Sequence, residues 1–172
     1  MVRLALRLRF KAWGSISAPA RNVSTIAPKL AVIGAQLLQE ALTGWMRGEI
    51  TPLEQDERQA SYYSQVKKEE GEIDWSRPAV EIWRRIRAFQ PWPGSYTTWK
   101  GKQLKINEAM PVKEPANGDP GTIIALEDNG VGIVTGEGVL KITGLQYEGK
   151  RSMHTHAFIQ GQRDFIGSRL PS

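Results

Sequence analysis

The sequence has no cysteine among its 172 residues, which excludes disulfide bonds and thiolate metal sites. It has two histidines, His154 and His156. Side chains two positions apart on a short helix point in different directions, so we expect surface histidines and no metal site. No apolar run approaches the roughly 18 residues that span a bilayer. With 40% apolar residues, we expect one globular domain plus extensions. The absence of cysteine fits a reducing compartment, and we expect the cytoplasm.

Acidic residues are missing from residues 1–24, which carry Arg3, Arg7, Arg9, Lys11 and Arg21. Five of the 23 basic residues lie there, so the rest of the chain balances 18 basic against 18 acidic residues. The net charge of +5 therefore comes from this tail. A mitochondrial presequence has such a composition. We favour non-native sequence joined by a frame error or a wrong start, and expect a disordered or loosely helical tail.

A second acid-free stretch runs from Ile82 to Asn107. Before it, Ser76 is placed to cap a helix, with Pro78 in the first turn. At helical spacing one side is apolar and the other is rich in arginine. Pro91 cannot continue the helix, and Pro93-Gly94 turns the chain into a strand. The apolar side consists of Ala79, Ile82, Trp83, Ile86 and Phe89.

Basic and aromatic side chains are interleaved along this second stretch. Such a mixture suits neutralisation of phosphates together with stacking on bases or sugars. Most of the aromatics are expected in the core, with Trp92 the best candidate for contact. A second basic pair follows in a turn near the end of the chain. The predicted nucleic-acid-binding residues are Arg84, Arg85, Arg87, Lys100, Lys102, Lys105, Lys150, Arg151 and Trp92.

Beyond Trp99 the sequence shows short apolar runs separated by turn signals. Asp128-Asn129-Gly130 is a strong hairpin signal, because Asn and Gly tolerate positive φ. The spacing predicts a small antiparallel barrel, and hence an α+β fold with flanking helices. The expected strands are 104–110, 121–126, 131–135, 139–144 and 145–148, followed by a short helix over 152–160 that Ser152 caps.

The segment before the acid-free stretch divides into a helix and a polar linker. Residues 28–47 have a wide apolar face at helical spacing, which needs a partner surface because an isolated helix is marginal in water. Residues 49–72 lack apolar periodicity and are predicted to be a linker. We therefore divide the chain into a tail (1–24), a helix (25–48), a linker (49–72) and a C-terminal domain (73–172).

The ordered set of motifs resembles the C-terminal portion of methionyl-tRNA formyltransferase. The segments that carry the resemblance are KLAVIGAQLLQEAL, GEITPLEQDERQASYYSQVKKEEG, IDWSRPAVEIWRRIRAFQPWPGSYTTWKGKQLKI, GVGIVTGEGVLKITGLQYEGKRSM and FIQGQRDFIGSRL. The resemblance covers about residues 25–170 and implies an OB-like barrel that binds initiator methionyl-tRNA in translation initiation. It also implies that residues 28–47 form the last helix of a catalytic domain.

The resemblance further implies a catalytic half that this sequence lacks. In the family, formyl transfer from 10-formyltetrahydrofolate uses an Asn-x-His and a Ser-Leu-Leu-Pro motif, which polarise the formyl group and accept the proton. Neither motif occurs here. We therefore expect no catalytic residue, no cofactor site and no metal site in this chain, and no formyl transfer by it alone.

Three interpretations stay open. The first is the tRNA-binding half of a truncated methionyl-tRNA formyltransferase. The second is a stand-alone RNA-binding module, or a subunit that self-associates or docks another protein through the helix over 28–47. The third is the C-terminal piece of another folate-dependent formyltransferase. The segment GVGIVTGEGVLKITGLQYEGKRSM favours the first interpretation over the third.

Overall fold

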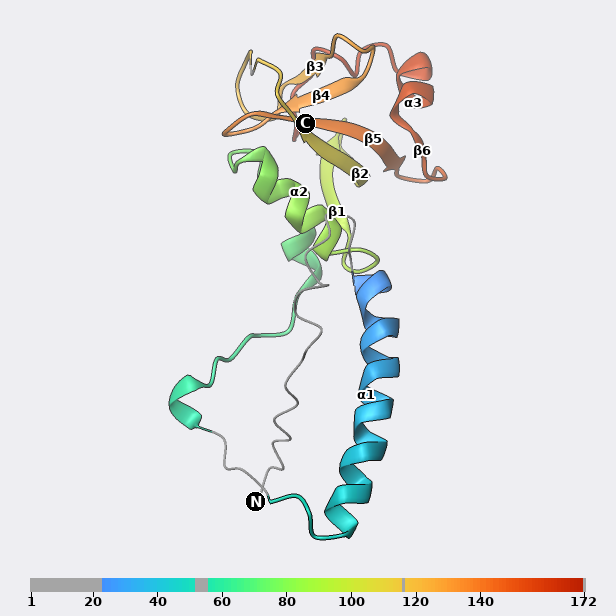
Figure 1. Cartoon of the computed structure of the whole chain (residues 1–172). Coiled ribbons are helices and arrows are strands. Elements are labelled where there is room, and N and C mark those ends of the chain that lie inside the picture. Colours follow the sequence, from blue (N-terminus) through green and yellow to red (C-terminus); the bar gives the residue numbers. More distant parts are fainter. Residues whose placement is uncertain (1–22, 52–55, 116, 172) are drawn as a thin grey trace. The chain divides into compact units, whose positions relative to one another are not determined.

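The computed structural model describes residues 23–51, 56–115 and 117–171 and divides the chain into two compact units, 1–65 and 66–172 (Figure 1). The expected tail lies almost wholly outside the described residues. The predicted domain boundaries remain predictions, and each unit is described by itself. Within the described residues, no helix is long and apolar enough to cross a membrane.

The first unit contains one long helix, α1 (Val23–Met46). The helix predicted over 28–47 is present and begins five residues earlier, with Pro28 inside it. One half of its apolar band, Ile33 and Leu37, is partly covered, whereas the adjacent half is exposed. The exposed half consists of Leu30, Leu38, Leu42 and Trp45, each between 42% and 57% exposed. A short 3-10 helix, Glu57–Gln59, follows and is capped by Asp56.

The second unit holds the remaining elements. A 3-10 turn, Lys68–Gly71, leads to the helix α2 (Ala79–Ala88). The strands β1 (Ser95–Trp99) and β2 (Lys102–Val112) form a hairpin. The strands β3 (Ile123–Ala125), β4 (Val131–Val134), β5 (Val139–Tyr147) and β6 (Met153–His154) complete the sheet, and α3 (Thr155–Gly161) comes last.

The strands form one antiparallel sheet in the order β1-β2-β5-β4-β3, with β6 paired to β5. The sheet is curled into a half-barrel, and α2 lies beside β1 and β2 (Figure 1). The predicted α+β class is therefore confirmed. The two edge strands are each covered by a short segment, which blunts edges that would otherwise pair with other chains. Glu72 bridges to Tyr96 on β1, and the backbone of Ser168 and Gly167 pairs with Ile123 on β3.

The core lies between the concave side of the sheet and α2. The helix contributes Ala79, Ile82 and Ile86, and β2 contributes Leu104 and Ile106, all nearly inaccessible to solvent. Beyond them an aromatic cluster joins the sheet to α3 and the C-terminal segment. It consists of Trp99, Tyr147, Phe158 and Phe165, whose rings meet edge to face at centroid distances of 5.0–5.8 Å. Trp83 is partly buried against the core, as expected for an aromatic residue on the inner side of α2.

Ser76 does not cap α2, contrary to the sequence prediction. Its backbone N–H and hydroxyl both donate to the Asp74 carboxylate, at 3.1 and 2.5 Å. Pro78 is the N-cap residue, and the first helical N–H, that of Ala79, donates to the carbonyl of Glu137 at 2.9 Å. A tertiary contact thus takes the place of a side-chain cap, because a local Asp-Ser turn occupies the serine.

The predicted strand division after residue 144 and the predicted start of the last helix also differ from the structure. The strands expected over 139–144 and 145–148 are one continuous strand, β5. Gly144 does not break it but faces a bulge in β2, where a Cβ would lie 3.1 Å from that of Glu108. Ser152 does not cap α3, because its hydroxyl accepts from Asn107 Nδ2 at 2.8 Å. His154 is the N-cap residue, so α3 begins at Thr155.

The hairpin predicted at Asp128-Asn129-Gly130 is confirmed. Asn129 has φ 58°, in the left-handed region that Asn tolerates. The Asn129 N–H donates to the carbonyl of Leu126, and the Leu126 N–H donates to that of Gly130, at 3.0 and 2.9 Å. This turn joins β3 to β4.

Candidate nucleic-acid interface

The three predicted arginines of α2 differ in their contacts. Arg84 is exposed. The Arg85 guanidinium donates to the carbonyl of Glu70 at 2.8 Å and lies 5.1 Å from the ring centre of Phe89. Arg87 lies 4.6 Å from the ring centre of Trp83. Arg85 and Arg87 are therefore held against aromatic rings, an arrangement that fixes the guanidinium group while leaving its charge in place.

Lys100 is held by an acidic partner. It forms an ion pair with Asp164 and lies 4.5 Å from the ring centre of Trp99. Its hydrogen bond holds the pKa of the Asp164 carboxyl below its ordinary value. A phosphate would have to compete with Asp164 for this ammonium group, so Lys100 is a weaker candidate than an unpaired lysine.

Lys105 lies on the convex side of the sheet. Its neighbours Leu104 and Ile106 are buried, and Lys105 itself is exposed, as alternation along a strand requires. It lies opposite Tyr96 on β1 and opposite Gln146 on β5. Lys102, three residues earlier at the start of β2, is exposed as well. An odd separation places the two lysines on opposite sides of the strand, as expected from the sequence.

The turn after β5 brings two further cations to Lys105. Gln146, directly across from Lys105, donates from Nε2 to the carbonyl of Lys150 at 3.0 Å. Lys150 and Arg151 are both exposed. Within the described residues, Lys105, Lys150 and Arg151 have no ion-pair partner. We refer to these three residues as the outer cation cluster.

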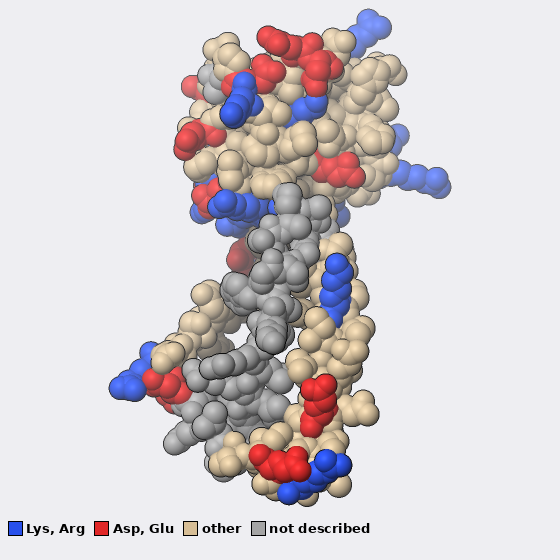
Figure 2. All heavy atoms as spheres, viewed as in Figure 1, with Lys and Arg blue, Asp and Glu red and all other residues tan. Residues whose placement is uncertain are grey.

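The predicted basic residues thus fall into two groups on opposite sides of the sheet. The helix α2 packs its buried face on the core side of β2, whereas Lys105 points away from the core. A rigid ligand that binds the outer cation cluster on the convex side of the sheet therefore does not need to contact α2. Figure 2 shows that acidic and basic side chains are interspersed on one face of this unit. Candidate phosphate-binding residues are therefore better identified by whether each cation has an acidic partner than by the total charge.

Trp92 is the most exposed tryptophan among the described residues, at 59%. It lies in the loop between α2 and β1, next to the bulge in β2. Gln90 attaches this loop to the sheet by donating from its side-chain amide to the carbonyl of Asn107. The sequence assigned no role to Gln90, Asn107 and Gln146 and predicted Ser152 only as a helix cap, whereas these four residues attach the loop and the turn to the sheet. Their roles follow from long-range contacts for which the sequence carries no signal.

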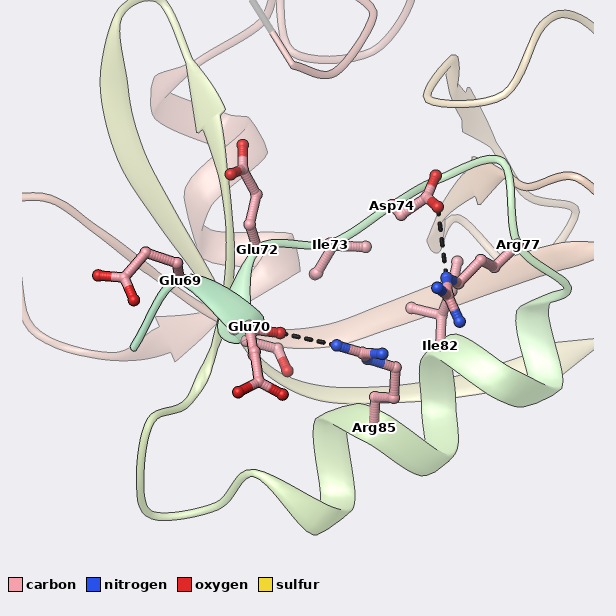
Figure 3. Close-up of a pocket in the computed structure, with 10 residues that line it drawn as sticks. Glu69, Glu70, Glu72, Ile73, Asp74, Arg77, Ile82 and Arg85 are labelled. Carbon is pink, nitrogen blue, oxygen red and sulfur yellow. Dashed lines mark hydrogen bonds and ion pairs between the residues drawn. The ribbon is translucent and has the colours of Figure 1, made fainter. Parts of the chain in front are cut away.

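The second unit also has a pocket of about 210 Å³ beside α2. Figure 3 shows Arg85 pointing to Glu70 and Arg77 pointing to Asp74 across its two sides. Glu69 and Glu72 line the pocket. Burial raises the pKa of the nearby Tyr96 hydroxyl, and the negative charges of Glu72 and Glu69 raise it further. Four carboxylates against two internally bonded arginines give a lining with net negative charge. This pocket is therefore a poor phosphate site.

Within the described residues, no cluster of three or more His, Asp or Glu side chains has the geometry of a metal site. His154 ends β6 and His156 lies within α3, and both are exposed. The predicted surface position of both histidines agrees with this arrangement.

Residues 65–163 match the family described as formyl transferase, C-terminal domain. The match covers more than half of the chain, and the chain belongs to this family. The curated relatives are methionyl-tRNA formyltransferases. The chain is 39% identical over 152 residues to that of Myxococcus xanthus, a region that covers 88% of this chain and 48% of the relative. It is 40% identical over 150 residues to that of Bacillus subtilis, a region that covers 87% of this chain and 47% of the relative.

The resemblance to the C-terminal portion of methionyl-tRNA formyltransferase is therefore confirmed, and the chain spans about half the length of the curated relatives it matches. Among solved structures, a variant of HypX from Aquifex aeolicus has a TM-score of 0.56 at 24% identity, covering 77% of this chain and 24% of that one. HypX in complex with tetrahydrofolic acid has a TM-score of 0.55. These similarities concern the fold alone.

Proposed function

We propose that this chain binds initiator methionyl-tRNA as the tRNA-holding part of a methionyl-tRNA formyltransferase. The observation that carries the proposal is the outer cation cluster, Lys105, Lys150 and Arg151, which is exposed and has no acidic partner among the described residues. The relatives are named for action on methionyl-tRNA. A cluster of cations without acidic partners among the described residues suits binding of a phosphate backbone. Such binding depends on the charge and shape of the RNA more than on its base sequence.

The remaining predicted residues have subordinate roles in this proposal. Arg84 on α2 and Lys102 on the other side of β2 are exposed but do not share the surface of the outer cation cluster. Arg85, Arg87 and Lys100 have internal partners, so their contribution to tRNA binding is smaller. The proposed location is the cytoplasm, where translation initiation takes place in this interpretation.

We also propose that the chain alone does not transfer formyl groups. The proposal rests on the sequence, in which the Asn-x-His and Ser-Leu-Leu-Pro motifs are missing. The tetrahydrofolic acid complex is known for a longer protein, of which the structural match covers 23%. We therefore assign folate binding to a part of the intact enzyme other than this chain.

The test of tRNA binding is a filter-binding titration with initiator tRNA at several salt concentrations. The expected result is saturable binding that weakens steeply as salt rises, because each phosphate contact releases counterions. No binding at low salt, or retention that is independent of salt, would contradict the proposal. A parallel assay with Met-tRNA and 10-formyltetrahydrofolate is expected to show no turnover by this chain.

A second candidate function, docking of another protein, is favoured by α1. Leu30, Leu38, Leu42 and Trp45 leave half of its apolar band exposed. An apolar helix face of this width is stable in water only when another surface covers it. We propose that α1 mediates association with a protein partner or with a second copy of this chain.

A further inference from the structure

Trp92 differs from the other tryptophans of the second unit in having no hydrogen-bond or ring partner among the described residues. The indole N–H of Trp75 donates to Thr97 Oγ1 at 3.3 Å, and that of Trp99 donates to Ser168 Oγ at 3.1 Å. Trp83 is covered by the guanidinium of Arg87. Within the described residues, Trp92 makes no hydrogen bond, ring contact or cation–π contact, and 59% of it is exposed.

The loop that carries Trp92 is fixed at both ends. The Gly94 N–H donates to the carbonyl of Phe89 at 2.9 Å and closes the loop. Gln90 donates to the carbonyl of Asn107 and holds the loop against β2. Pro91 and Pro93 flank the tryptophan and restrict the backbone torsion φ on either side of it. The indole is thus presented by a preorganised loop, which lowers the entropy lost when it binds a ligand.

The loop is attached to the part of the sheet that holds the outer cation cluster. Asn107, whose carbonyl receives Gln90, donates from its own side chain to Ser152 Oγ at 2.8 Å. Ser152 directly follows Lys150 and Arg151. Lys105 precedes Asn107 by two residues on β2. The loop that carries Trp92 and the segment that follows Lys150 and Arg151 are therefore both attached to Asn107 of β2.

A single exposed tryptophan is common on protein surfaces and needs no explanation by itself. An apolar protein partner would require a contiguous apolar patch around it, whereas the loop is attached to the sheet through polar groups, Gln90 to Asn107 and Asn107 to Ser152. A nucleotide matches this composition, since it combines a flat base that stacks on indole with a phosphate that binds cations.

We propose that Trp92 is a stacking platform for an unpaired nucleotide of the RNA, whose flanking phosphates bind the outer cation cluster. The inference rests on the proposed function, because it specifies which part of an RNA this surface selects. A fully paired stem keeps its bases stacked inside the helix, so only a single-stranded end or loop can place a base on the indole. The surface would thus distinguish RNA with an unpaired segment from blunt duplex RNA.

The test compares two RNA hairpins that differ only in a short single-stranded 3′ extension, with the full chain at one fixed salt concentration. We expect the wild type to bind the extended hairpin more tightly than the blunt one. Trp92→Ala should weaken binding of the extended hairpin by roughly 5- to 150-fold, the range for loss of one base–aromatic stack, and should leave the blunt hairpin nearly unchanged. Trp92→Phe should restore most of the difference.

Met110→Ala is the matched control, because Met110 is an exposed apolar residue of β2 at 51% exposure. It should alter neither affinity. Equal loss for both hairpins in Trp92→Ala, or no loss for either, would overturn the stacking platform while leaving RNA binding as the proposed function. Failure of the wild type to bind either hairpin would overturn both.

Discussion

Lys105 on β2 lies directly opposite Gln146 on β5, and Gln146 in turn binds the carbonyl of Lys150 at 3.0 Å. Strand register and one hydrogen bond thus bring the turn that carries Lys150 to the strand that carries Lys105, 45 residues earlier in the sequence. The amide group positions the turn after β5 without neutralising either lysine. Among the described residues, neither lysine has an acidic partner, so this surface carries positive charge that no ion pair neutralises.

Replacement of Lys105 by Gln should reduce tRNA affinity and lower the salt dependence of binding by about one unit of slope, the effect of one lost phosphate contact. Filter binding at several salt concentrations measures both quantities. Lys141→Gln is the matched control, because Lys141 also lies on the sheet but pairs with Asp128. If the two variants behave alike, Lys105 has no specific role.

Replacement of Lys100 by Gln should weaken tRNA binding less than Lys105→Gln does. The Lys100 ammonium already pairs with Asp164, so a phosphate gains less from it. The same titration measures this difference. A loss of affinity larger than that of Lys105→Gln would show that the ion pair opens for the ligand.

Replacement of Trp99 by Ala should destabilise the second unit by about 3–5 kcal/mol, the usual cost of removing a buried aromatic side chain. Trp99 is 1% exposed and contacts three other aromatic rings. Urea unfolding followed by circular dichroism measures the change. Trp92→Ala, at an exposed site, should change the unfolding free energy by far less, and equal effects would contradict this account of the core.

Stability should depend on pH through Asp74. The hydrogen bonds from the Ser76 side chain and backbone hold the pKa of this carboxyl in the folded state below its ordinary value. A lowered pKa contributes stability above the unfolded value, and the contribution is lost as pH falls through the folded pKa. Asp74→Asn should therefore be less stable than the wild type near neutral pH, and the difference should vanish at acidic pH. A difference of the same size at neutral and at acidic pH would contradict the assignment.

The exposed half of α1 should cause concentration-dependent association. Sedimentation velocity over a range of protein concentrations is expected to show species larger than the monomer. A double change of Leu37 and Leu38 to Gln should shift the distribution toward monomer, since both residues belong to the apolar band of α1. A wild type that stays monomeric at every concentration would contradict self-association.

The sequence predicted the elements of the second unit because their signals are local. The spacing of Ala79, Ile82 and Ile86 defined the buried face of α2, and Asn129 defined the hairpin between β3 and β4. The prediction that Ser76 caps α2 was wrong, because the neighbouring Asp74 binds the serine and Glu137, distant in sequence, supplies the acceptor for the helix start.

The candidate interface could be predicted only as a list of cations and one tryptophan. Which cations are neutralised depends on long-range pairs such as Lys100 with Asp164, and which ones gather depends on strand register, as for Lys105 and Gln146. Composition cannot show either relation. The separation of α2 from the convex side of the sheet likewise follows from packing, because an arginine-rich helix and a lysine-rich strand look equivalent in the sequence.

The most direct measurement is the salt dependence of initiator tRNA binding by the wild type and by a variant in which Lys105, Lys150 and Arg151 are all changed to Gln. The slope of log affinity against log salt should be steep for the wild type and shallower by about 2–3 units in the variant, at roughly 0.7–0.9 per phosphate contact. The same slope in both proteins would contradict the assignment of the outer cation cluster as the tRNA-binding surface.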